Sequence, residues 1–226
     1  MTAVRREVLV PVAFLVLAVA VPAWWWLGRP APDAGPPVVS VASPVSPAPS
    51  ASPGPSGAPR APSPSPAQAA PAREVPVPVP VRLVVPAIGV DAAVQDVGVD
   101  ARGLLVVPAQ ARVVGWYRFS PPPGSGEGAS VIAGHVDARG QGPGALFRLR
   151  ELDVGDRLTV QRQDGSAVRY RVAARQTIVK GRLPVERLFA RDGPPRLVVV
   201  TCGGPFLPDL GSYRDNVVVV ALPEGS

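Results

Sequence analysis

The chain has one cysteine, Cys202, and one histidine, His135, among its 226 residues. Each follows a short apolar run: Cys202 ends the segment Val-Val-Val-Thr-Cys, and His135 ends Ser-Val-Ile-Ala-Gly-His. A single cysteine cannot form a disulfide within the chain, so its thiol is either a small buried apolar group or a nucleophile. Nucleophilic cysteines react as thiolates and commonly work beside an imidazole. The pair therefore predicts nucleophilic catalysis, provided that folding brings together two residues that are 67 positions apart in the sequence.

Acyl transfer also needs a group that stabilises an oxyanion, either a hydrogen-bond donor or a positive charge. Arg214, in the segment Tyr-Arg-Asp-Asn, is the nearest arginine after Cys202 in the sequence. If the strand that ends at Thr201 and the strand that follows it are neighbours, the loop between them returns Arg214 to the thiol. Asp137 is expected to cap a turn rather than to take part in chemistry.

Taken one at a time, these residues have structural explanations. A lone cysteine is often a small core residue, a lone histidine at a strand end is often a hydrogen-bonded structural residue, and an isolated arginine usually belongs to a surface ion pair. The combination of the three in one domain is what favours catalysis.

Short strands must position these residues. Seven runs rich in β-branched residues are predicted as strands, at residues 82–85, 104–107, 130–133, 157–161, 168–173, 197–201 and 216–221. Gly, Pro and Asp separate them, and no long amphipathic helix competes with them. The pattern predicts a mostly β barrel or sandwich over residues 81–226, with helical turns near 145–149 and 185–190.

The N-terminal region, residues 1–29, is predicted to anchor the chain in a membrane. Arg5 and Arg6 precede an uncharged apolar run at 8–27, which is long enough to cross a bilayer and ends in three tryptophans. The alternative is a cleaved signal peptide, because Ala-Val-Ala at 18–20 has the form of a cleavage site. Both interpretations export the domain, and the anchor places it on the extracellular face of the cell membrane.

Residues 30–80 are dominated by Pro, Ala, Ser and Gly, a composition that predicts a disordered, extended spacer between the anchor and the domain. The net charge of +6 is spread over the arginines. Because no dense basic block and no interleaved aromatic residues are present, nucleic acid is not an expected partner.

Three segments together resemble the sortases, the cysteine transpeptidases that act on sorting signals at the bacterial surface. They are residues 130–137, the segment Val-Val-Val-Thr-Cys-Gly-Gly, and residues 213–219, and residues 81–90 resemble the family's first strand. The order His, Thr-Cys, Arg is specific, and the resemblance spans essentially the whole domain. Cys-Gly-Gly, Tyr-Arg-Asp-Asn and the Ala/Arg/Pro-rich composition are most similar to the actinobacterial class F enzymes, with class E the next possibility.

The resemblance implies an eight-stranded β-barrel and a reaction. Cys202 would attack the Thr-Gly carbonyl of a Leu-Pro-x-Thr-Gly-like signal on a surface protein and form a thioacyl enzyme. His135 would protonate the leaving amine and deprotonate the incoming one, which is commonly an amine of a peptidoglycan precursor. Arg214 and Thr201 would stabilise the oxyanion. The segment 179–189 would correspond to the loop that binds the signal.

The chain departs from the family's Thr-Leu-x-Thr-Cys motif, because Val198 and Val199 occupy its first two positions. We expect this change to affect packing more than chemistry. Some sortases also bind calcium through clustered carboxylates. Glu186 and Asp192 are the only acids in the corresponding loop, so the sequence predicts no metal requirement and no cofactor.

Two other functions stay open at this point. One is an L,D-transpeptidase, which also uses an exported cysteine but is expected to carry its histidine and cysteine within one motif. The other is a non-catalytic module that binds the cell wall at the end of the spacer.

Overall fold

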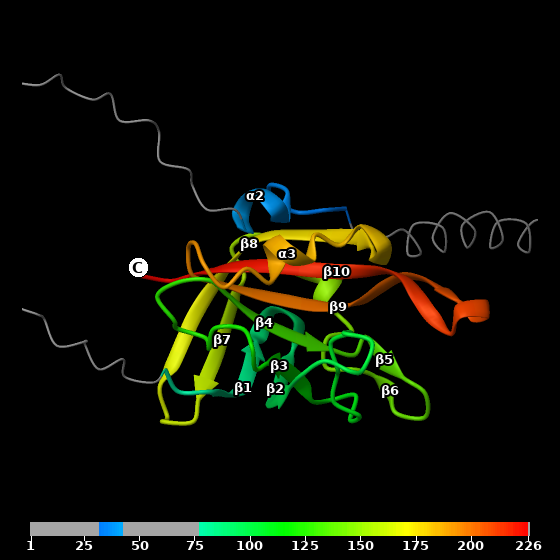
Figure 1. Ribbon diagram of the computed structural model, residues 1–226, viewed down its shortest axis with the longest axis horizontal. Coiled ribbons are helices and arrows are strands. Elements are labelled where there is room, and N and C mark those ends of the chain that lie inside the picture. Colours follow the sequence, from blue (N-terminus) through cyan, green and yellow to red (C-terminus); the bar gives the residue numbers. More distant parts are fainter. Residues whose placement is uncertain (1–31, 43–76, 226) are drawn as a thin grey trace, which may run out of the picture. The chain divides into compact units, whose positions relative to one another are not determined.

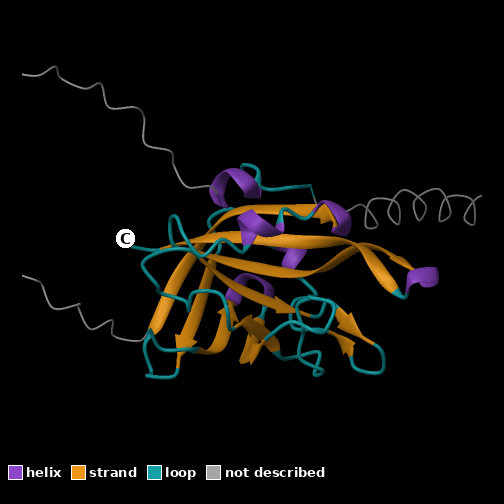
Figure 2. Ribbon diagram, in the orientation of Figure 1, coloured by secondary structure: helices purple, strands orange, loops and turns teal. Residues whose placement is uncertain are grey.

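The computed structural model describes residues 32–42 and 77–225. Within these ranges eight strands close into a barrel, and strands dominate the molecule (Figures 1 and 2). Around the barrel the order is β1 (Pro80–Val85), β2 (Val90–Val97), β3 (Val114–Tyr117), β4 (Ala129–Gly134), β9 (Arg196–Leu207), β10 (Ser212–Pro223), β8 (Ala167–Val179) and β7 (Arg157–Arg162). The prediction of a mostly β, eight-stranded barrel is confirmed.

The remaining elements are short. A separate two-stranded sheet pairs β5 (Asp137–Ala138) with β6 (Gly142–Pro143). The helical elements are α2 (Val38–Ala42), α3 (Val185–Leu188), η1 (Pro86–Ile88), η2 (Leu149–Glu151), η3 (Lys180–Arg182) and η4 (Pro208–Leu210). The helical turns predicted near 145–149 and 185–190 correspond to η2 with the turn before it, and to α3. Among the described residues no helix is both long and apolar enough to cross a membrane, and the run at 8–27 lies outside them.

The prediction of a strand at 104–107 is wrong, and two strands of the barrel, β2 and β3, were not predicted. β2 and β3 pair in parallel, with Val94 opposite Val114. Parallel neighbours need a crossover connection, so the chain between them leaves the sheet. Leu104 is 57% exposed in this connection, and only an isolated bridge joins Leu105 to Val99. β2 contains two aspartates, which are depleted in strands, and β3 is only four residues long and includes a glycine.

Apolar side chains are buried on both faces of the barrel wall. Leu197 and Val199 belong to the core inside the barrel, whereas Val198 belongs to a second cluster on its outer face. We call the second set the outer cluster; it contains Val38, Ala42, Ala129, Val131, Ala174, Leu188, Val198, Val218 and Val220. A strand buried on both faces reads as a continuous apolar run, which explains the valines of β9 and β10. Val198 and Val199, which occupy the first two positions of the altered motif, are both fully buried, so the change from that motif lies in the packing of the barrel wall.

Part of the predicted spacer is ordered. Ala34 pairs with Arg175 of β8 through two backbone hydrogen bonds of 2.9 and 2.7 Å, and the Val38 N–H donates to the Gln176 side-chain oxygen at 2.8 Å. Val38 is completely buried in the outer cluster. β7 pairs only with residues 167–171 of β8. The edge of β8 after these residues is therefore open to backbone hydrogen bonds, and Ala34 pairs with it there. The prediction of disorder is therefore wrong for residues 33–42, while residues 43–76 lie outside the described ranges.

Candidate active site

The register of two neighbouring strands brings the histidine and the cysteine together. β4 and β9 run parallel, and their pairs extend from Ala129 opposite Arg196 to Ala133 opposite Val200. In every pair the two residues are 67 positions apart in the sequence, and so are Gly134 and Thr201, which share a hydrogen bond between the two strands. His135 and Cys202 are also 67 positions apart. Adjacent strands lie about 4.8 Å apart. The lone histidine and the lone cysteine therefore occupy matching positions two steps beyond the last pair.

Alternation along the strands puts both side chains on the outer face. Val131 of β4 and Val200 of β9 pack in or against the outer cluster, and residues two apart point to the same side of a strand. His135 lies four positions after Val131, and Cys202 lies two after Val200. Cys202 is a half-buried free thiol. The sulfur and the imidazole are thus accessible at the same rim of the barrel.

Thr201 faces the opposite way. Its side chain is buried, and its hydroxyl donates a hydrogen bond of 2.8 Å to the carbonyl oxygen of Gly134. Thr201 immediately precedes Cys202 and Gly134 immediately precedes His135. The hydroxyl is committed to joining the two strands, so this geometry gives the Thr201 side chain a positioning role and does not support the oxyanion role expected for it.

Neighbouring backbone atoms hold the His135 ring in place. Nε2 lies 2.9 Å from the carbonyl oxygen of Pro108. A carbonyl can only accept, so Nε2 is the donor and a neutral ring in this tautomer carries its lone pair on Nδ1. The chain also folds tightly against the histidine: a Cβ on Gly144 would lie 2.2 Å from the His135 carbonyl oxygen. The Pro108 carbonyl and Gly144 were not recognised from the sequence, because backbone contacts across 27 and 9 residues leave no local pattern.

Arg214 sits at an irregularity between β9 and β10. Tyr213 is opposite Phe206 and Asp215 is opposite Gly203, so two residues of β9 face Arg214 alone. Such a bulge changes the direction of a side chain. Asn216, two residues after Arg214, is the partner of Cys202. β10 therefore returns the arginine to the neighbourhood of the thiol, as the loop length predicted.

In this structure Asp215 binds the Arg214 guanidinium. Nε and Nη2 donate to the two carboxylate oxygens at 2.8 and 2.9 Å, and this hydrogen bonding lowers the pKa of the buried Asp215. Nη1 takes no part in these two bonds. Gly204 at φ +71° lies against the same carboxylate, and a Cβ there would be 2.1 Å from Oδ2. The second glycine of Cys-Gly-Gly thus makes room for the aspartate that holds the arginine.

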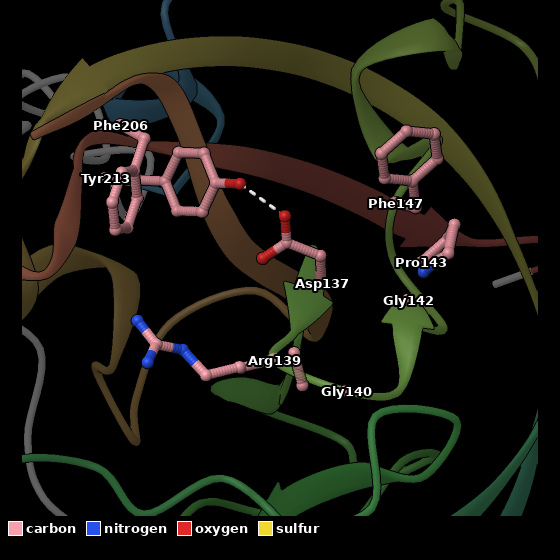
Figure 3. Close-up of a pocket in the computed structure, with 9 residues that line it drawn as sticks. Asp137, Arg139, Gly140, Gly142, Pro143, Phe147, Phe206 and Tyr213 are labelled. Carbon is pink, nitrogen blue, oxygen red and sulfur yellow. Dashed lines mark hydrogen bonds between the residues drawn. The ribbon is translucent and has the colours of Figure 1, made fainter. Parts of the chain in front are cut away.

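Tyr213 and Asp137 connect the segments that carry the histidine and the arginine. The Tyr213 hydroxyl donates a short hydrogen bond to Asp137, which follows His135 by two residues (Figure 3). This bond, burial, the carboxylate charge and the nearby Cys202 together raise the pKa of Tyr213 to about 12. Asp137 therefore joins two strands rather than only capping a turn, and Tyr213 is a site residue to which the sequence assigned no role.

A family model described as Sortase domain matches residues 83–224. The chain belongs to the sortase family. The match covers the barrel from Leu83 in β1 to the end of β10, including both residues at the rim and Arg214. A search of curated proteins found no match.

Solved sortase structures share the fold of this sortase. Sortase C1 of GBS Pilus Island 1 is 18% identical, with a TM-score of 0.50 over 64% of each chain. Sortase A from Corynebacterium diphtheriae is 19% identical, with a TM-score of 0.51 over 66% of this chain and 62% of that one. Sortase C-1 from Actinomyces oris is 22% identical, with a TM-score of 0.50 over 65% of this chain and 76% of that one. The matched region is thus under two thirds of the first two structures.

The connection between β8 and β9 of this sortase, residues 180–195, is tethered at both ends. Lys180 donates to the Ser212 hydroxyl at 2.7 Å, and Arg196, which is buried, donates to the Arg187 carbonyl oxygen at 3.0 Å. Between them, Leu188 of α3 is fully buried in the outer cluster. The connection therefore packs on the outer face of the barrel before β9 reaches the cysteine. Within residues 32–42 and 77–225, no group of three or more His, Cys, Asp or Glu is arranged to hold a metal ion.

A pocket of about 470 Å³ lies on the other side of the cysteine along β9. It opens between the β5–β6 hairpin and the β9–β10 hairpin (Figure 3). Its lining includes two charged residues, Asp137 and Arg139, and three aromatic residues, Phe147, Phe206 and Tyr213. This sortase thus has a covered outer face before Cys202 and an open pocket beyond it.

Proposed function

We propose that this chain is a cysteine transpeptidase that cleaves a Leu-Pro-x-Thr-Gly-like sorting signal between Thr and Gly and transfers the acyl group to an amine. The observation that carries the proposal is the shared register of His135 and Cys202 at the rim of β4 and β9. Membership of the sortase family supports it. An L,D-transpeptidase is less well supported, because the two residues lie on separate strands rather than within one motif.

The first half-reaction makes a thioacyl enzyme. The Cys202 thiol first gives its proton to Nδ1 of His135. The resulting thiolate attacks the threonine carbonyl carbon, a carbon–sulfur bond forms, and the carbonyl oxygen takes the negative charge. The positive charge of Arg214 stabilises this oxyanion, with Nη1 free of the Asp215 bonds. His135 then gives a proton to the glycine nitrogen as the carbon–nitrogen bond breaks.

The second half-reaction releases the product. His135 takes a proton from the incoming amine, whose nitrogen attacks the thioacyl carbon. A carbon–nitrogen bond forms, the carbon–sulfur bond breaks, and the Cys202 thiolate is restored. Because His135 Nε2 is occupied by its hydrogen bond to Pro108, the proton transfers of both half-reactions in this proposal use Nδ1. Water in place of the amine gives slow hydrolysis.

The partners and the location are part of the same proposal. The donors are surface proteins with a C-terminal sorting signal, and the acceptor is an amine of a peptidoglycan precursor. Cys-Gly-Gly and Tyr-Arg-Asp-Asn support an assignment to class F. The apolar run at 8–27 supports a single-pass anchor in the cell membrane, with the catalytic domain on the extracellular face.

The proposal is tested with the full-length chain, purified in detergent. The chain is incubated with a Leu-Pro-x-Thr-Gly peptide and hydroxylamine, and mass spectrometry measures the threonine hydroxamate. Wild type is expected to form the hydroxamate, and Cys202→Ala to form none. A lack of product across Leu-Pro and Leu-Ala signals, together with cell-wall binding retained by Cys202→Ala, would support the wall-binding module instead.

A further inference from the structure

The pocket beyond Cys202 has the position that a second substrate requires. The segment 179–189 is expected to bind the signal, and the connection between β8 and β9 that contains most of it packs on the outer face before the cysteine. Phe206 of the pocket lies four residues after Cys202 on the same strand, and Tyr213 immediately precedes Arg214. An acyl group held on the covered side leaves this open side for the amine that departs and the amine that arrives.

Residues that line the pocket are close in sequence to the catalytic residues. Asp137 follows His135 by two residues, and its carboxylate accepts the Tyr213 hydroxyl hydrogen (Figure 3). Cys202 lies near enough to Tyr213 to affect the pKa of its phenol. The pocket therefore lies on the side of the barrel rim that carries the imidazole and the thiol.

Two opposite charges line this one pocket. Asp137 belongs to β5 and Arg139 to the turn that follows it, and both side chains line the pocket. Tyr213 bonds to Oδ2 of Asp137, and the carboxylate has further lone pairs for a cation. The aromatic walls of Phe147, Phe206 and Tyr213 offer ring faces that also attract an ammonium group.

We propose that this pocket selects the acceptor, and that the acceptor is a primary amine whose molecule also carries a carboxylate. Asp137 receives the ammonium end beside His135, Arg139 receives the carboxylate, and the aromatic residues enclose the chain between them. The inference rests on the proposed function, which requires an amine acceptor. It adds a selection by charge: an amine without a carboxylate would lose the contact with Arg139.

Binding tests this without any cleavage. The full-length Cys202→Ala chain in detergent is titrated with three matched compounds, and calorimetry or ligand-detected NMR gives each Kd. Nα-acetyl-lysine has both charges, its carboxamide has only the ammonium, and Nα-acetyl-norleucine has only the carboxylate. We expect Nα-acetyl-lysine to bind roughly fivefold more tightly than either the carboxamide or Nα-acetyl-norleucine, because each of these lacks one ion pair and a partly exposed ion pair contributes about that much to affinity. Equal Kd values for the acid and the carboxamide would overturn the proposal.

Variants assign the preference to residues. Arg139 is exposed in the hairpin, so Arg139→Gln is expected to fold and to abolish the difference between acid and carboxamide. Asp137→Asn, which keeps an oxygen for Tyr213, should weaken both amines and leave Nα-acetyl-norleucine unchanged. Arg169→Gln, at an exposed position on β8 outside the pocket, is the matched control and should change nothing. A preference that survives Arg139→Gln would also overturn the proposal.

The two proposals fail separately. If wild type forms the hydroxamate but its Cys202→Ala variant binds acid and carboxamide equally, the transpeptidase stands and the acceptor pocket is wrong. If the preference is present and depends on Arg139, but no signal peptide is cleaved, the pocket stands as a binding site and the transpeptidase function is wrong.

Discussion

The Thr201 hydroxyl donates a hydrogen bond to the Gly134 carbonyl oxygen, and each of these residues immediately precedes one of the proposed catalytic residues. The bond crosses between β9 and β4 at the last point where the two strands are held side by side. It therefore sets the spacing of the cysteine and the histidine without touching a substrate.

Replacing Thr201 by valine should separate this role from direct catalysis. Valine keeps the shape but leaves the buried Gly134 carbonyl without its donor, which costs about 1–3 kcal/mol of stability. We expect kcat to fall while the KM for the signal stays the same. Thr201→Ser restores the hydroxyl and should restore kcat. An unchanged kcat in Thr201→Val, measured by peptide cleavage, would contradict the positioning role.

Gly144→Ala should displace the histidine. A Cβ there would lie 2.2 Å from the His135 carbonyl oxygen and 2.9 Å from its Cβ, and both belong to backbone or to a short side chain that cannot rotate away. We expect at least a tenfold loss of kcat, because catalytic groups must be held to within a fraction of an ångström. Gly126→Ala meets no atom within 4 Å and serves as the control. Equal rates for the two variants would show that the contact is not limiting.

The ordered segment at 33–42 should stabilise the barrel. Val38→Ala removes two completely buried methyl groups and should lower the free energy of unfolding by about 1–3 kcal/mol. Val39→Ala makes the same chemical change at a half-buried position and should have a smaller effect. Denaturant unfolding of the full-length chain compares the two. If both variants are as stable as wild type, the docking of α2 contributes nothing.

The Arg214–Asp215 pair should make stability depend on pH in the acid range. Because the folded state lowers the pKa of Asp215, the stabilisation is present above its ordinary value of 3.8 and is lost as the pH falls through the folded pKa. Arg214→Gln removes the main cause of the shift. The difference in unfolding free energy between wild type and this variant is therefore expected to be largest near pH 6 and to shrink below pH 3.8. A difference that is constant from pH 6 to pH 2.5 would contradict the pairing.

Transfer activity should be unchanged by a chelator. Only Glu186 and Asp192 supply carboxylates to the connection 180–195, and two carboxylates are few for a calcium ion, which takes six to eight oxygen ligands. Hydroxamate formation is measured after dialysis against EDTA, and again with calcium restored. Loss of activity that calcium recovers would overturn the prediction.

Much of the barrel could be predicted because its strands are buried on both faces. The valines of β9 and β10 form continuous runs, so their positions were predicted correctly. The separation of His135 and Cys202 could be counted in the sequence, but its meaning depends on the parallel register of β4 and β9, which no local pattern reveals. The Pro108 carbonyl and the hydrogen bond from Tyr213 to Asp137 likewise depend on contacts between distant segments.

Composition misled at two places. Residues 104–107 have strong β propensity, but they lie in the crossover between β2 and β3 and have no strand beside them. Residues 33–42 lie within a Pro- and Ala-rich region, where Val38 and Ala42 are nevertheless spaced to bury one side of a helical turn. In both cases the neighbouring strands decided the outcome.

The central claim is that Cys202 carries the acyl group beside His135, and the mass of the intact chain tests it most directly. Full-length protein is mixed briefly with a Leu-Pro-x-Thr-Gly peptide, quenched in acid and measured by mass spectrometry. The account predicts an added mass equal to the peptide acyl group ending at Thr, located on Cys202 and removed by hydroxylamine. His135→Ala should acquire it much more slowly. Cleavage of the peptide by Cys202→Ala, or an acyl group found on another residue, would contradict the account.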